Sequence, residues 1–99
     1  MNEPLSNSAI SKLKRLAQKL EPVLFLGKSG ASDSFMKSFD EVLGQHELVK
    51  IKFAAFKDER KTLAPQLAEK TGSQLIWIVG HVAVFYRQQP DPEKRKVAV

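Results

Sequence analysis

Apolar residues recur along this chain with two spacings, one typical of helices and the other of strands. Between residues 10 and 20 they lie three or four positions apart and share one helical face, and Ser6 or Ser8 can cap the start of this helix. Residues 47–53 instead alternate, with apolar side chains on one face and lysines on the other. The pattern therefore predicts both element types, including a strand with a cationic outer face.

The remaining elements follow from the same two spacings and from the turn residues between them. Glu21-Pro22 ends the first helix, because the residue before a proline is pushed out of the helical conformation. The further elements that we predict are a strand at 23–26, a helix at about 33–46, a helix at about 58–71, and strands at 75–79 and 82–87.

Glycine and proline mark the ends of the later elements. Gly72 is suited to stop the third helix, and Gly80-His81 is suited to a two-residue type II′ hairpin turn. Pro65 leaves two possibilities open. If the helix begins near Asp58, Pro65 removes an internal hydrogen bond and bends it; if Pro65 lies near the first turn, the preceding residues form a separate turn.

The element order helix, strand, helix, strand, helix, strand, strand predicts an α/β fold. Right-handed helical crossovers allow the first three strands to run in the same direction, with the last one antiparallel. The last two strands are apolar on both faces, so we expect helices on both sides of a small mixed four-stranded sheet. Trp77 and Tyr86 are then core residues, although exposed stacking platforms for bases are the alternative.

Composition indicates one basic domain. The chain has 99 residues, is 42% hydrophobic, and carries a net charge of +5 with a pI near 9.6. This length supports one core, which we place in residues 1–88, followed by a basic and disordered tail at 89–99. The charge favours a polyanionic partner.

Several classes of function are disfavoured by the residues that are missing. There is no cysteine, and His46 and His81 are the only histidines, so we expect neither a metal site nor a cofactor. No apolar run approaches the ~20 residues that span a bilayer, and the N-terminus lacks the features of a signal peptide. We therefore expect a soluble, cytoplasmic protein without a membrane partner.

The segment Gly27-Lys28-Ser29-Gly30 joins a predicted strand to a predicted helix, an arrangement that builds anion sites. Gly-Lys-Ser also ends the nucleotide-binding P-loop, but that motif needs a glycine where Pro22 stands. A G-x-x-G loop between strand and helix is typical of KH-type RNA binders, which clamp a nucleic-acid backbone with it. A simple tight turn is the alternative.

The predicted topology brings basic residues to this loop. The carboxyl ends of strands that run in one direction share an edge of the sheet, where ligands of open α/β sheets bind. If the first helix runs antiparallel to the strand after it, its N-terminal half approaches the same edge. The candidate RNA-binding residues are then Gly27, Lys28, Ser29, Gly30, Lys12, Arg15, Lys57, Arg60 and Lys61.

Four ordered segments resemble the CRM domain family, in particular its stand-alone YhbY-like bacterial members. They are Leu16-Ala17 through Val23, Leu26 through Gly30, His46 through Phe53, and Ile78 through Arg87. The resemblance implies the fold of the C-terminal domain of the third bacterial translation initiation factor. It also implies RNA binding through a basic surface that includes the G-x-x-G loop, and association with precursors of the large ribosomal subunit.

We therefore expect a non-catalytic RNA-binding protein that contacts ribosomal RNA and assists ribosome assembly, with no small-molecule substrate. An enzyme would require an activated nucleophile or a poised base, and Ser29 has no histidine near it in sequence. The alternative is a protein-interaction module whose basic face docks an acidic partner.

Overall fold

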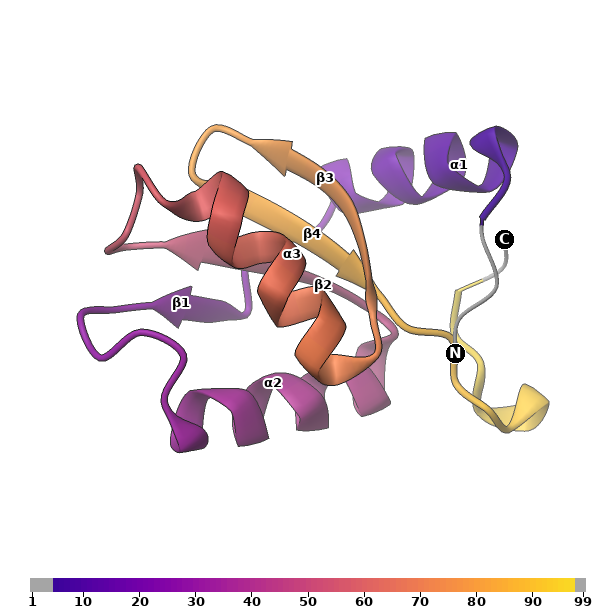
Figure 1. The fold of residues 1–99 in the computed structure, drawn as a ribbon. Coiled ribbons are helices and arrows are strands. Elements are labelled where there is room, and N and C mark those ends of the chain that lie inside the picture. Colours follow the sequence, from indigo (N-terminus) through magenta and orange to yellow (C-terminus); the bar gives the residue numbers. More distant parts are fainter. Residues whose placement is uncertain (1–4, 98–99) are drawn as a thin grey trace.

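Four strands form one mixed sheet, and helices cover both of its faces (Figure 1). The computed structural model describes residues 5–97. Its elements are α1 (Asn7–Gln18), β1 (Leu24–Leu26), α2 (Asp33–His46), β2 (Leu48–Phe53), α3 (Arg60–Thr71), β3 (Gln74–Val79), β4 (Val82–Tyr86) and the short 3-10 helix η1 (Pro92–Lys94). The predicted α/β class and the order of its seven main elements are confirmed.

The strands lie in the order β1-β2-β4-β3. β1 pairs with β2 in parallel, and β4 is antiparallel to both β2 and β3. β1, β2 and β3 therefore run in one direction, as predicted, although β4 lies between β2 and β3. The carboxyl ends of these three strands share one edge, on the left of Figure 1.

Two separate hydrophobic clusters hold the three layers together. On one face, α2 and α3 pack over Phe53 and Phe85, with the Phe39 ring edge-on to Phe85 at 5.0 Å between ring centroids. On the other face, Leu13 of α1 packs in a cluster with Val84 and Tyr86. Each large side chain removed from water in this way contributes about 1.5–3 kcal/mol. Both faces of the sheet are thus covered, as the sequence predicts.

The helix ends follow their capping residues. The hydroxyl group of Ser6 accepts the N–H of Ala9 at 3.1 Å, so Ser6 rather than Ser8 caps α1. Gly72 ends α3 in the left-handed conformation with φ of +65°. Gly80 has φ of +56° and β3 and β4 are joined by a two-residue turn, as the hairpin prediction requires.

Pro65 lies inside α3 and combines parts of both predicted possibilities. The helix begins at Arg60, and a separate turn precedes it, closed by the N–H of Glu59 on the carbonyl oxygen of Phe56. Pro65 nevertheless follows the first turn of α3 and has no N–H to donate to Lys61. Both residues are exposed, so water can bind the carbonyl that Pro65 leaves free.

The two aromatic residues of the last strands belong to the layer beneath α1. Tyr86 is 2% exposed, and burial together with the nearby Glu47 carboxylate raises the pKa of its hydroxyl group above 10.0. Trp77 packs against the same cluster, and the ammonium group of Lys14 lies 5.4 Å from the centre of its ring. The core interpretation therefore describes these residues better than the platform interpretation.

Residues 89–97 differ from the predicted disordered tail, because Glu47 binds them to the domain. Glu47 is 1% exposed, and its carboxylate accepts the backbone N–H groups of Gln89 at 2.8 Å, of Val97 at 2.9 Å and of Lys96. Its own backbone carbonyl accepts the N–H of Arg87. A buried carboxylate needs such donors to offset its lost hydration. Residues 98 and 99 lie outside the described range.

We predict that Glu47→Gln loosens this C-terminal segment. The amide can accept on one side only, and its NH₂ group would face a backbone donor, which costs about 1–3 kcal/mol. Hydrogen exchange should show faster exchange at Gln89 and Val97, with a lower melting temperature. Glu41→Gln, on the exposed surface of α2, is the matched control. Unchanged protection at both amides would contradict this role.

Candidate functional site

Three loops meet at the edge of the sheet where β1, β2 and β3 end. The carbonyl oxygen of Leu26 accepts hydrogen bonds from Ala54 at 3.0 Å and from Ala55 at 2.9 Å, which joins the β1–α2 loop to the β2–α3 loop. The N–H of Phe53 donates to His81 at 2.7 Å and brings the hairpin turn beside them. This is the edge at which the sequence places the candidate site.

The β1–α2 loop is a tight turn with two solvent-exposed residues at its tip. The N–H of Gly30 donates to the carbonyl of Gly27 at 2.9 Å, and Lys28 and Ser29 are exposed between them. Gly30 has φ of +65°, a conformation that favours glycine. Gly27 does not have a positive φ, and a Cβ atom there would meet nothing within 4 Å. The fold therefore requires glycine at position 30 but not at position 27.

Phe56 packs the two loops together. A Cβ atom on Gly30 would lie 3.4 Å from the Phe56 ring, so the ring rests directly against the glycine. Phe56 itself adopts φ of +55°, which is unusual for a bulky residue. The position of the G-x-x-G loop is thus set by both neighbouring segments of backbone.

The start of α2 is less open to a phosphate than the loop before it. The hydroxyl group of Ser32 accepts the N–H of Phe35 at 3.2 Å, which occupies one of the free donors of the first turn. Asp33 is exposed in the same turn, where its carboxylate stabilises the helix but repels an anion on the helix axis. An anion at this edge is therefore better placed on the loop than on the helix axis.

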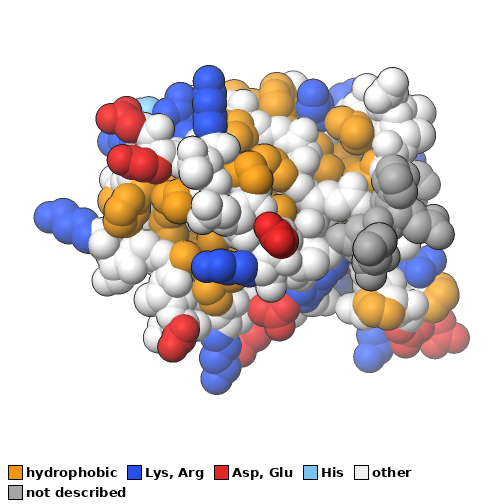
Figure 2. Space-filling model, viewed as in Figure 1, with side chains coloured by type: hydrophobic (Ala, Val, Ile, Leu, Met, Phe, Trp, Pro, Cys, Tyr) orange, Lys and Arg blue, Asp and Glu red, His pale blue; other side chains and the backbone are white. Residues whose placement is uncertain are grey.

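The β2–α3 loop supplies two exposed cations. Lys57 and Lys61 are exposed, whereas Arg60 is partly buried and donates to the carbonyl oxygen of Lys57. Arg60 thus holds the loop in shape. Asp58 and Glu59 are exposed between these residues, and Figure 2 shows basic, acidic and hydrophobic side chains intermixed at this end of the molecule.

Lys12 and Arg15 do not join this surface. Leu13 packs near Leu48, at the edge where β2 begins, so the N-terminal half of α1 lies away from the loops (Figure 1). The prediction assumed that α1 runs antiparallel to β1. The extended segment 19–23 instead carries the chain back to the start of β1, so α1 need not reverse direction. Lys12 and Arg15 are exposed and, with Lys19, line a separate basic groove along α1.

Two lysines of β2 have different roles. The ammonium group of Lys50 donates to the carbonyls of Ala17 and Leu20, both at 2.9 Å, and so caps the C-terminal end of α1. Lys52 is exposed near the loop edge and pairs in register with Phe25 of β1. The sequence pattern indicates the cationic face of this strand, but Lys52 is absent from the predicted set of site residues.

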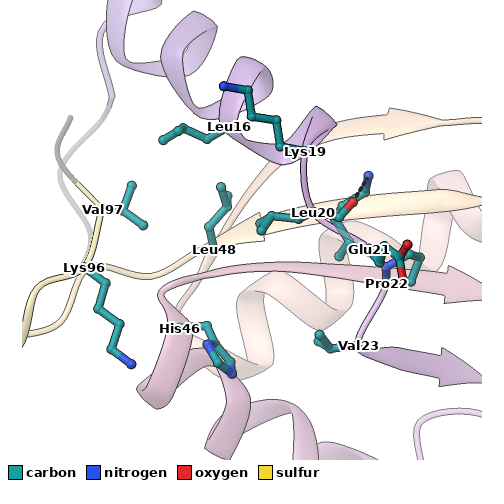
Figure 3. A pocket seen from close by; sticks show the side chains of 11 residues that line it. Leu16, Lys19, Leu20, Glu21, Pro22, Val23, His46, Leu48, Lys96 and Val97 are labelled. Atoms are coloured by element: carbon teal, nitrogen blue, oxygen red, sulfur yellow. Dashed lines mark hydrogen bonds between the residues drawn. The ribbon is translucent and has the colours of Figure 1, made fainter.

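A groove of about 620 Å³ lies near the opposite edge of the sheet, between the end of α1 and the C-terminal segment. Figure 3 shows Leu16, Leu48 and Val97 around it, with His46 and two lysines at its margins. Within residues 5–97 no cluster of histidine and carboxylate side chains could hold a metal ion. In the same described range, no helix is long and apolar enough to cross a membrane.

Known proteins share this sequence pattern and this fold. A probable RNA-binding protein of Pseudomonas aeruginosa is 31% identical over 91 residues, which cover 91% of this chain and 88% of that protein. An RNA-binding protein of Haemophilus influenzae is 31% identical over 84% of this chain and 85% of its own length. The solution structure of a hypothetical Staphylococcus aureus protein, for which RNA binding has been suggested, has a TM-score of 0.77 at 29% identity and covers 96% of this chain and all of that one.

The family model for the CRS1/YhbY (CRM) domain matches residues 5–87, which include the loop edge and every helix and strand of the sheet. The chain therefore belongs to the CRS1/YhbY (CRM) domain family.

Proposed function

We propose that this protein is a non-catalytic RNA-binding protein and that the loop edge is its principal RNA contact. The observation that carries the proposal is the exposed G-x-x-G turn, with Gly27 open to a close backbone approach and Lys28 at its tip. The family relationship and the relatives described as RNA-binding proteins support it.

The chemistry of the contact follows from these groups. Lys28 and free backbone N–H groups of the loop hold a phosphate, and Lys57 and Lys61 attract its neighbours along the strand. These contacts position the RNA without reading its sequence. The basic groove of Lys12, Arg15 and Lys19 on α1 serves as a second contact for an RNA long enough to reach around the molecule.

We further propose that the cellular target is ribosomal RNA in precursors of the large subunit, bound in the cytoplasm during assembly. The resemblance to stand-alone YhbY-like proteins supports this part. The second candidate is a module that docks an acidic protein, which the net charge of +5 also favours.

We predict that crosslinking in cells, followed by sequencing of the attached RNA, recovers large-subunit ribosomal RNA, including unprocessed precursor sequence. The positive charge and the loop make RNA the favoured partner. A Lys28→Ala variant at equal abundance is the control and should recover less. Recovery of an acidic protein without RNA would favour the second candidate instead.

We predict that Lys28→Ala weakens binding and lowers the salt dependence of affinity, because one lost phosphate contact removes about 0.7 to 0.9 from the slope. The Lys12→Ala, Arg15→Ala double variant should produce a comparable loss only with longer RNA. Lys70→Ala, in the last turn of α3, is a charge-matched control at the other edge. If Lys28→Ala leaves the slope unchanged and the double variant flattens it on short RNA, the α1 groove is the principal contact.

We predict that Gly27→Ala and Gly27→Val weaken RNA binding in order of their bulk, although they change no charge and the fold has room for both. The melting temperature should stay constant for Gly27→Ala. Gly30→Ala, by contrast, should destabilise the fold by about 1–2 kcal/mol because of its positive φ. Normal RNA binding by a folded Gly27→Val would mean that the loop is only a tight turn.

A further inference from the structure

Phe25 is the most exposed of the large hydrophobic side chains in residues 5–97, with 60% of its surface accessible. Its neighbours Leu24 and Leu26 pack into the core beneath α2 and α3. Because strand residues alternate between faces, the ring of Phe25 lies on the opposite face of the sheet. No residue of β1 belongs to the described cluster under α1, so this part of the face is uncovered.

The ring is part of a small apolar patch with charged neighbours. Leu20 is 40% and Val23 is 49% exposed, and Val23 shares the strand face of Phe25. Lys52 is the register partner of Phe25, and Lys19 and Glu21 are exposed beside Leu20 in the chain. A single exposed hydrophobic residue is ordinary, but a contiguous patch bordered by polar side chains marks an interaction site.

The position of Phe25 indicates what covers the patch. Phe25 precedes Gly27 by two residues, or about 6.6 Å along a strand, a distance that one nucleotide can bridge between its phosphate and its base. Aromatic side chains stack with any base, and Lys52 lies beside the ring to attract a phosphate. The bases of a regular duplex are already stacked on one another, so only an unpaired base can use the ring.

We propose that Phe25 is a stacking platform for an unpaired base of the RNA whose phosphate the β1–α2 loop holds. This inference rests on the proposed RNA-binding function and narrows its substrate to RNA with single-stranded nucleotides at the loop. The aromatic residues Trp77 and Tyr86 cannot take this role as well, because both pack against α1.

Two substitutions separate stacking from simple apolar contact. Phe25→Leu keeps a large apolar side chain without a π face, and Phe25→Trp enlarges the π face. The probes are a single-stranded oligoribonucleotide of mixed sequence and a fully paired RNA hairpin. We expect Phe25→Leu to weaken binding of the single strand about 5-fold or more, to leave hairpin binding unchanged, and Phe25→Trp to bind the single strand at least as well as the wild type.

A direct measurement accompanies the affinities and does not depend on the folding of a variant. In the wild-type protein, a single strand that contains 5-iodouridine should form a photo-crosslink to Phe25. The exposed ring contributes little to the core, so the melting temperature of Phe25→Leu should match that of the wild type.

The possible failures are distinguishable. If Lys28→Ala weakens binding of the single strand but Phe25→Leu does not and no crosslink forms at Phe25, the stacking proposal is overturned, and the RNA-binding proposal stands. The same result is expected if the patch docks a protein. If the wild type binds neither RNA, the proposed function fails and the stacking proposal fails with it. Equal losses for both RNAs with Phe25→Leu also overturn stacking.

Discussion

The carbonyl oxygen of Leu26 connects the two halves of the candidate RNA surface. It accepts N–H groups from both Ala54 and Ala55, so the parallel pairing of β1 and β2 continues into the loops that follow them. The Phe56 ring then rests on Gly30 and prevents the loops from moving apart. A phosphate-binding turn on a flexible loop would lose conformational entropy on binding, whereas these two contacts order the turn beforehand.

The positive charge of the chain is divided between structure and surface. Lys50 caps α1, Arg60 holds the β2–α3 loop, and Arg87 forms an ion pair with Asp40 at 2.6 Å while it also donates to the carbonyl of Thr71. These three side chains join elements that hydrophobic packing alone leaves apart. The exposed lysines are the ones that remain available to attract a polyanion, and the net charge of +5 therefore does not describe a uniform surface.

The sequence allows the elements, the direction of three strands and the loop edge to be predicted, because periodicity, capping residues and strand polarity are local. The direction of α1 is not local, since the segment 19–23 permits either orientation and the packing of Leu13 near Leu48 decides between them. Arg60 and Lys50 look like surface charges until their carbonyl partners are known. Likewise, Glu47 lies more than 40 residues from the amides that it binds, so a segment with the composition of a tail is ordered.

The two edges of the sheet are poor templates for another strand. β1 has only three residues before Gly27 ends it, and β3 has an irregular register between Leu75 and Trp77. Short or irregular edges discourage the edge-to-edge pairing that leads to aggregation. A sheet with longer, flatter edges could not safely expose an aromatic ring and two aliphatic side chains beside β1. The brevity of β1 therefore allows the protein to keep an apolar patch open to a ligand and still remain dispersed at high concentration.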